Sequence, residues 1–276
     1  MSAGLVYDVR PSSAISREFF KEIWFFRRLV WLFIWRDIVV RYKNTLLGAA
    51  WYIVQPVAMT IVSTLFFGRV FSRSIGDIPY PLFAYCNLLL WQLFSRSLSL
   101  SASSLVQYTP MLSKVYFPRL IVPASYVLGA LFDFFLTSIL LGLMMAWYGI
   151  PPSASIVFIP VVLAFTLMCA MGCGCVLAAI DARYRDVRHA LPLLIQVWMF
   201  CSPVMYPTLH IPERWRLLYS LNPTVGLTEA FRWLIFRIGA PPQPEALILA
   251  GVTSLALFTV GVLYFQRVQG TLVDTL

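Results

Sequence analysis

Aromatic rings and amide side chains recur together in the stretches 51–67 and 85–94, and such a set can bind a sugar. A sugar ring stacks its apolar C–H faces on aromatic rings, while its hydroxyl groups need hydrogen-bond partners such as amides. The candidates are Trp51, Tyr52, Gln55, Phe66, Phe67, Tyr85, Asn87, Trp91, Gln92 and Phe94. Lipid-facing belts and helix packing also use aromatic residues, and these uses must account for most of the rings.

Asp133 is the clearest charged residue inside a long apolar run, and Arg96 lies near the end of another run. A charge inside a membrane is costly, so it marks either a functional site or an ion pair. Asp133 could bind a substrate or a proton. We favour a structural pair with Arg96 or with a backbone group, because one acidic residue is a thin basis for proton-driven transport.

The sequence contains no motif of a self-contained enzyme. It lacks the G-x-x-x-x-G-K-[ST] loop that holds nucleotide phosphates, and it lacks G-x-S-x-G and H-E-x-x-H. Asp181, Asp186 and His189 lie in the stretch DARYRDVRH and leave a membrane glycosyl- or acyltransferase open as an alternative. We favour a salt-bridged loop there. We predict no metal site, because His189 and His210 fall on opposite sides of the membrane in the expected topology.

The composition identifies an integral membrane protein built from helices. Hydrophobic residues make up 60% of the chain and charged residues 12%, whereas a soluble domain carries about 25% charged residues. Apolar runs of about 20 residues favour helices over a barrel. We predict an all-α membrane protein with a six-span domain over 46–267. The spans are expected at 46–67, 81–99, 120–148, 156–180, 190–206 and 246–265.

The remaining segments are shorter and more polar. Residues 1–16 and 268–276 are predicted tails, and 17–45 predicts a helix in the membrane surface with a connecting loop, because aromatic and basic residues mix there. An insert at about 207–244 contains two short helices that are too charged to span, Pro212–Leu221 and Pro223–Arg237. The stretch 156–180 is rich in small residues, which predicts close helix contacts.

The basic residues predict the orientation of the chain in the membrane. Six spans place both termini on the same side. With the N-terminus inside, fourteen of the 21 Lys and Arg residues fall on the inner side and six on the outer side. Basic residues concentrate in cytoplasmic segments, so both termini are expected in the cytoplasm and the 207–244 insert outside.

Five motifs that occur in one order carry a resemblance to a known family. They are RDIVVRYKNTLLGAAWYIVQP, IPYPLFAYCNLLLWQLFS, KVYFPRLIVP, DARYRDVRH, and SPVMYP followed by IPERWRLLYSLNPTVGLTEAFRW. Over about residues 17–267 the chain resembles the permease subunit of the ABC-2 type polysaccharide exporters, which include O-antigen, capsule and teichoic acid exporters. Each motif alone is weak, and the ordered set is specific.

The resemblance implies a transport subunit and not an enzyme. It implies a homodimer in the bacterial inner membrane that works with two copies of a separate ABC ATPase, which holds the ATP and Mg²⁺. This chain would bind no cofactor and no nucleic acid. The expected substrate is an undecaprenyl-linked polysaccharide, first an O-antigen for lipopolysaccharide biosynthesis, with capsular polysaccharide or teichoic acid as the alternative. An ABC-2 permease for drugs or lipids is a further alternative.

The resemblance also assigns roles to residues. The substrate entrance, where lysine and arginine would neutralise pyrophosphate, comprises Arg36, Arg41, Lys43, Leu47 and Gly48. The channel lining comprises Trp51, Tyr52, Gln55, Phe66, Tyr85, Asn87, Trp91, Gln92 and Phe94. Coupling to the ATPase is assigned to Arg27, Arg28, Lys114, Tyr116 and Phe117. The external gate helices carry Pro212, Trp215, Glu229 and Arg232.

Overall fold

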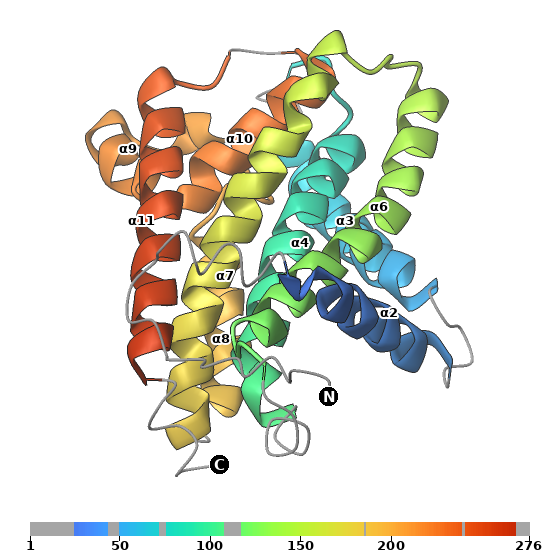
Figure 1. Cartoon of the computed structure of the whole chain (residues 1–276). Coiled ribbons are helices and arrows are strands. Elements are labelled where there is room, and N and C mark those ends of the chain that lie inside the picture. Colours follow the sequence, from blue (N-terminus) through green and yellow to red (C-terminus); the bar gives the residue numbers. More distant parts are fainter. Residues whose placement is uncertain are drawn as a thin grey trace, which may run out of the picture.

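The described part of the chain folds into a bundle of helices. The computed structural model describes residues 25–43, 50–71, 76–107, 117–184, 186–238 and 241–268, and all regular secondary structure within these ranges is helical. The long helices run alongside one another, and α2 crosses them obliquely at one side (Figure 1). The helices are α2 (Arg27–Lys43), α3 (Trp51–Phe71), α4 (Tyr80–Gln107), α6 (Ile121–Tyr148), η2 (Ala154–Phe158), α7 (Ile159–Arg183), α8 (Val187–Phe200), η3 (Thr208–His210), α9 (Glu213–Ser220), α10 (Pro223–Phe236) and α11 (Pro244–Val268).

The centre of the bundle is α4, which packs against α3, α6, α7 and α10. Its residues 82–91 are all buried. The following turns are rich in serine, and the hydroxyls of Ser99 and Ser103 donate to backbone carbonyls one turn back. Such bonds satisfy polar groups inside a helix that has little contact with water. Ser97, Ser101 and Ser104 are buried in the same turns, and their hydroxyls meet no hydrogen-bond partner among the described residues.

Four helical segments among the described residues are long and apolar enough to cross a membrane. They are Trp51–Phe71, Ile121–Tyr148, Ala154–Arg183 and Pro244–Val268. The other two predicted spans fall on α4 and α8. The first carries Arg96 and many serines, which lower its hydropathy, and the second has only 14 residues. The helical class is confirmed, whereas the count of six spans stays a prediction.

A very close contact between α7 and α11 depends on glycine. A Cβ built on Gly261 would lie 2.1 Å from the carbonyl oxygen of Gly172, and one on Gly172 would lie 2.3 Å from that of Leu257. No side chain fits between the two backbones. The close contacts predicted from the small residues of 156–180 are confirmed here.

The predicted insert forms the helices η3, α9 and α10 after a turn that follows α8. The two predicted short helices are confirmed, as α9 and α10, and no bound is shifted by more than one residue. Asn222 caps α10, since its side-chain oxygen accepts from the backbone N–H of Thr224, and it also accepts from the indole N–H of Trp198 in α8. These bonds fix α10 against α8. The helix is largely buried against α4, α7 and α11.

Candidate functional site

Four charged side chains meet where α2, α4 and α6 cross. Asp133 of α6 accepts a hydrogen bond from Nη1 of Arg41 in α2 at 2.7 Å. Nε of Arg96 in α4 lies 2.6 Å from the same carboxylate oxygen, off the line of its N–H bond. Nη2 of Arg41 also binds Asp37, one turn earlier in α2, at 2.7 Å. We call Asp37, Arg41, Arg96 and Asp133 the ion-pair cluster.

The cluster balances two positive and two negative charges in a poorly hydrated place. The Asp133 side chain is 5% exposed and that of Arg41 is 15% exposed. Isolated charges would be very costly there, so mutual pairing is a condition for burying any of them. Burial raises the pKa of Asp37 above its ordinary value, although the guanidinium of Arg41 opposes the shift. The expected pair between Asp133 and Arg96 is confirmed, with Arg41 as an additional partner.

A polar cavity of about 390 Å³ lies directly beside the cluster. The hydroxyl of Tyr52 in α3 accepts a hydrogen bond from Arg96. This bond connects the ion-pair cluster to α3, in addition to α2, α4 and α6. Serine and threonine hydroxyls and apolar side chains complete the wall. We call it the polar cavity, and its main polar and charged lining residues are Tyr52, Gln55, Gln92, Arg96 and Asp133.

The structure separates the predicted lining residues into three groups. Tyr52, Gln55 and Gln92 line the polar cavity. Trp51 and Phe66 lie on the outer face of α3 and are 54% and 73% exposed. The other four are buried inside the chain: Tyr85, Asn87, Trp91 and Phe94.

The four buried residues hold the bundle together. The Tyr85 hydroxyl donates to the carbonyl of Thr137 at 2.9 Å, which links α4 to α6. Asn87 donates to the carbonyls of Pro203 and Val204, at 3.2 and 3.0 Å. Trp91 and Phe94 pack against each other with ring centroids 5.4 Å apart. Their partners lie within the chain, so these four residues face the interior of the bundle and not the polar cavity.

The predicted entrance cations lie on α2 in different surroundings. Arg36 and Lys43 are exposed, whereas Arg41 is partly buried in the ion-pair cluster. Leu47 and Gly48 lie outside the described residues. Arg41 therefore supports the fold, and Arg36 and Lys43 offer accessible charge.

The predicted coupling residues divide in the same way. Arg27 and Arg28 are exposed at the start of α2. Phe117 is buried, and its ring packs edge-on against Phe33 of α2 with centroids 5.6 Å apart. This contact ties the segment before α6 to α2. Lys114 and Tyr116 lie outside the described residues.

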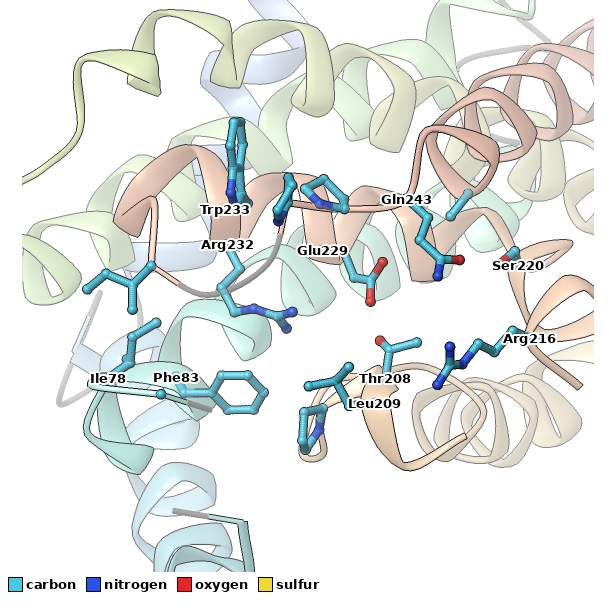
Figure 2. Close-up of a pocket in the computed structure, with 16 residues that line it drawn as sticks. Ile78, Phe83, Thr208, Leu209, Arg216, Ser220, Glu229, Arg232, Trp233 and Gln243 are labelled. Atoms are coloured by element: carbon cyan, nitrogen blue, oxygen red, sulfur yellow. The ribbon is translucent and has the colours of Figure 1, made fainter. Parts of the chain in front are cut away.

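The predicted gate residues lie on α9 and α10. Pro212, which immediately precedes α9, and Trp215 within it are exposed. Glu229 and Arg232 of α10 line a second cavity, of about 180 Å³, which also borders α9 (Figure 2). This cavity is separate from the polar cavity.

The stretch DARYRDVRH contains a buried ion pair. Asp181 is 1% exposed, and Nε of Arg188 donates to its two carboxylate oxygens at 3.1 and 3.0 Å. The preferred salt-bridged interpretation is confirmed. Asp186 and His189 are exposed, so the three groups that a transferase would need are not gathered into one site.

Comparison with known proteins decides the family. The ABC-2 type transporter family matches residues 28–236, most of the chain. This chain belongs to the ABC-2 type transporter family. The predicted resemblance is confirmed. This ABC-2 permease is a transport subunit and not an enzyme, since the ATPase of the family is a separate subunit.

Its relatives are proteins of O-antigen export, polysialic acid transport and capsule polysaccharide export. The permease is 29% identical over 249 residues to the O-antigen export system permease protein RfbA of Myxococcus xanthus, a match that covers 90% of this chain and 95% of that one. It is 25% identical over 235 residues to the RfbA protein of Klebsiella pneumoniae, covering 85% and 89%. It is 24% identical over 251 residues to the polysialic acid transport protein KpsM of Escherichia coli, covering 86% and 92%.

Asp37, Arg96 and Asp133 of this ABC-2 permease are not among the predicted site residues, although the sequence contains signals for them. Asp37 and Arg41 are four residues apart, a spacing that brings side chains together on one face of a helix. Asp133 and Arg96 were noticed as charges in apolar runs but were not assigned to the lining. No local pattern links Arg41 to Asp133, because these residues are 92 positions apart.

Proposed function

We propose that this permease is the membrane subunit of an ATP-driven exporter that moves a lipid-linked polysaccharide, most specifically an O-antigen, across the bacterial inner membrane. The relatives at 29% and 25% identity are O-antigen permeases, and the capsule and polysialic acid proteins match at 24% or less. Because these values lie close together, capsular polysaccharide is the second candidate. In either case the substrate is a long polyhydroxylated chain.

The observation that carries the proposal is the composition of the polar cavity. Tyr52 offers a ring that already contacts the Arg96 guanidinium, 4.1 Å from the ring centroid. Gln55 and Gln92 offer amides that both donate and accept hydrogen bonds. Arg96 and Asp133 add a charged but internally balanced wall. The volume of about 390 Å³ lies within the range of about 300–1,000 Å³ that ligand sites in proteins have. This wall suits weak, repeated contacts with sugars better than one tight site.

The proposed assembly is a homodimer with the passage between two copies. The exposed face of α3 supports this, because α3 is a long apolar helix that buries only Pro56, Thr60 and Ser63 within one chain. Trp51, Leu65 and Phe66 lie uncovered on it. In this arrangement the polar cavity would face the passage beside α3.

The proposed topology has six spans with both termini in the cytoplasm. It counts α4 and α8 as spans in addition to the four apolar segments. The distribution of the basic residues supports the orientation. On this topology α9 and α10 lie at the outer face as gate helices, and α2 lies at the cytoplasmic surface where lipid-linked substrate and membrane lipids would meet Arg36 and Lys43.

The proposed energy transfer runs through α2. Two copies of a partner ATPase, holding ATP and Mg²⁺, would dock on α2 and on the segment that ends at Phe117. The ion-pair cluster and the contact of Phe33 with Phe117 connect α2 to α4 and α6. A displacement of α2 would therefore move two walls of the polar cavity together, since packed elements shift as rigid bodies.

A surface-polysaccharide assay tests the proposal. Deleting the gene should remove one polymer from the cell surface, and the wild-type gene should restore it. Replacing Gln55 or Gln92 by leucine should lower export roughly 2- to 10-fold each, the worth of a neutral hydrogen bond. Trp147→Ala is the matched control, because Trp147 is 86% exposed and lies away from the cavity.

The assay can contradict polysaccharide export itself, the choice of O-antigen as the polymer, and the role of the polar cavity. Unchanged surface polymers after deletion would refute polysaccharide export. Loss of a capsule rather than O-antigen would select the second candidate. Full export by both leucine variants, at wild-type protein levels, would remove the polar cavity from the substrate path.

A further inference from the structure

The second cavity lies between the start of α4, η3, α9, α10 and the segment that leads into α11. Figure 2 shows its polar side chains converging from different elements: Arg232 and Glu229 from α10, Arg216 from α9, Thr208 from η3 and Gln243 from the α11 connection. We call it the arginine cavity. It shares no lining residue with the polar cavity.

Arg232 is the group that needs a partner. Its guanidinium lies 4.9 Å from the centroid of the Phe83 ring, which fixes its position. Its Nη1 is buried, and no hydrogen-bond acceptor meets it within the described ranges. Glu229, one turn earlier on α10, lines the same cavity, yet the two side chains form no ion pair among the described residues. A buried donor nitrogen without an acceptor is unfavourable, so Nη1 of Arg232 is suited to an incoming acceptor.

Arg216 approaches from the opposite side. Its Nε donates to the carbonyl of Ile211 at 3.1 Å, and its Nη1 lies 3.6 Å from a carboxylate oxygen of Glu213, which is 88% exposed. These contacts orient the side chain, and Figure 2 shows its head group directed toward Thr208. The hydroxyl of Thr208 is also buried without a partner in the described structure. Two guanidinium groups and a hydroxyl therefore surround one space.

We propose that the arginine cavity binds one anionic group, a carboxylate or a phosphate, between Arg232 and Arg216. The planar guanidinium carries a fork of N–H donors that matches the paired oxygens of either group. The charged residues of the lining are two arginines and one carboxylate, Glu229. Glu213, the counter-charge of Arg216, lies outside the lining and is 88% exposed, so water screens its hold on Arg216 and a ligand can compete for that arginine.

The size of the arginine cavity limits what the anionic group can be attached to. A volume of about 180 Å³ is smaller than the roughly 300 Å³ at which sites for larger ligands begin. It admits a free anion, or a single sugar that carries the anionic group. In the second case Glu229 and Gln243 are placed to bind its hydroxyls. The proposal stands on this cavity alone and requires neither export nor a direction of transport.

Thermal unfolding of the full-length purified permease in detergent tests the proposal. The probes are inorganic phosphate, glucuronate, glucose 1-phosphate and neutral glucose, each titrated at constant ionic strength. The anionic probes should raise the midpoint saturably and glucose should not. Tighter binding of glucuronate and glucose 1-phosphate than of inorganic phosphate would assign the site to an acidic sugar. The reverse order would assign it to a free anion.

Variants locate the binding. Arg232→Gln and Arg216→Gln should each weaken the anion at least about tenfold, because each removes a charged donor. Glu229→Gln should tighten it several-fold, because a competing negative charge is gone. Arg214→Gln is the matched control, an exposed arginine of α9 outside the cavity, and should bind like the wild type.

Two results would overturn the proposal. One is the absence of a saturable shift with all three anions. The other is a shift that persists unchanged in Arg216→Gln and Glu229→Gln. These two variants decide the matter even if Arg232→Gln does not fold, since they are expected to change affinity in opposite directions.

Discussion

The ion-pair cluster and the arginine cavity both place two arginines beside carboxylates, but they pair those charges differently. In the cluster, Asp133 contacts both Arg41 and Arg96 within 2.7 Å. In the arginine cavity, Arg232 and Glu229 share a helix and a cavity without forming an ion pair. We call charges that contact each other directly a closed pair and charges that share a site without contact an open pair. A closed pair joins two elements of the structure, whereas an open pair leaves its charges available to a ligand.

The difference follows from how the side chains reach each other. In the cluster, Arg41 of α2 and Arg96 of α4 approach Asp133 of α6 from two other helices, while Asp37 pairs with Arg41 along α2. Glu229 and Arg232 lie three positions apart on α10, and the contact of Arg232 with Phe83 holds the guanidinium in its own position. Breaking a closed pair should therefore affect stability, while changing an open one should affect binding.

The largest expected effect comes from removing the shared carboxylate of the cluster. Asp133→Asn leaves Arg41 and Arg96 without their common counter-charge, and loss of one partner in a buried network costs about 3–5 kcal/mol. The thermal midpoint or the yield of folded protein should fall sharply. Adding Arg96→Gln should recover part of the loss, because one uncompensated charge is removed.

Asp186→Asn is the matched control for this substitution, since Asp186 is exposed. An Asp133→Asn protein as stable as the control would mean that the cluster is dispensable. Anion binding at the arginine cavity should survive in any Asp133→Asn protein that folds, which would keep the two sites independent.

The second expected effect concerns the arginine cavity and leaves the ion-pair cluster unchanged. A Cβ on Gly226 of α10 would lie 2.4 Å from the carbonyl oxygen of Ala246 in α11. Gly226→Ala should cost about 1–3 kcal/mol, as overpacking does, and should displace the helix that carries Glu229 and Arg232. Chemical denaturation and anion titration measure the two consequences. Gly142→Ala is the control, since nothing lies within 4 Å of its Cβ.

A third change is finer, because it keeps the charge. Arg41→Lys retains a cation but loses the planar fork that reaches Asp37 and Asp133 at once. Loss of one charged hydrogen bond should cost about 1.5 kcal/mol. If α2 transmits the motion of an ATPase, the variant should also hydrolyse more ATP per polymer exported in the assembled complex. Arg267→Lys, at an exposed position of α11, should change neither quantity.

The helical class and several contacts could be predicted from local patterns. Apolar runs located α3, α6, α7 and α11, and the small residues of α7 predicted its close contact with another helix. Prolines at the start of two short polar segments located α9 and α10. These features depend on residues close together in the chain, so a single sequence contains them.

The division of the aromatic and amide residues could not be predicted. Tyr52, Gln55 and Gln92 face a cavity, while Tyr85 and Asn87 bond to carbonyls in α6 and in the turn after α8. All of them fit a sugar-binding set by type. Their separation depends on which helix packs against which face of α4, and these contacts span 52 to 117 positions of sequence. Chemistry alone does not specify such pairings.

The smallest expected effect is the pH dependence of stability that comes from Asp37 of the ion-pair cluster. It tests whether burial of Asp37 or its pairing with Arg41 dominates. Burial raises the pKa of Asp37 above 3.8 in the folded protein, despite the nearby Arg41. The folded state then binds more protons than the unfolded state between these two pKa values, so stability falls as the pH rises through that window. Above the folded-state pKa, the contribution of Asp37 to the free energy of unfolding no longer changes with pH.

Asp37→Asn should remove this slope, which thermal midpoints measured across the acidic range would reveal as a difference between wild type and variant. If the wild type instead gained stability relative to Asp37→Asn as the pH rose, the pairing with Arg41 would outweigh the burial of Asp37. The cluster would then be even more tightly closed than the distances imply, and its contrast with the arginine cavity would be greater.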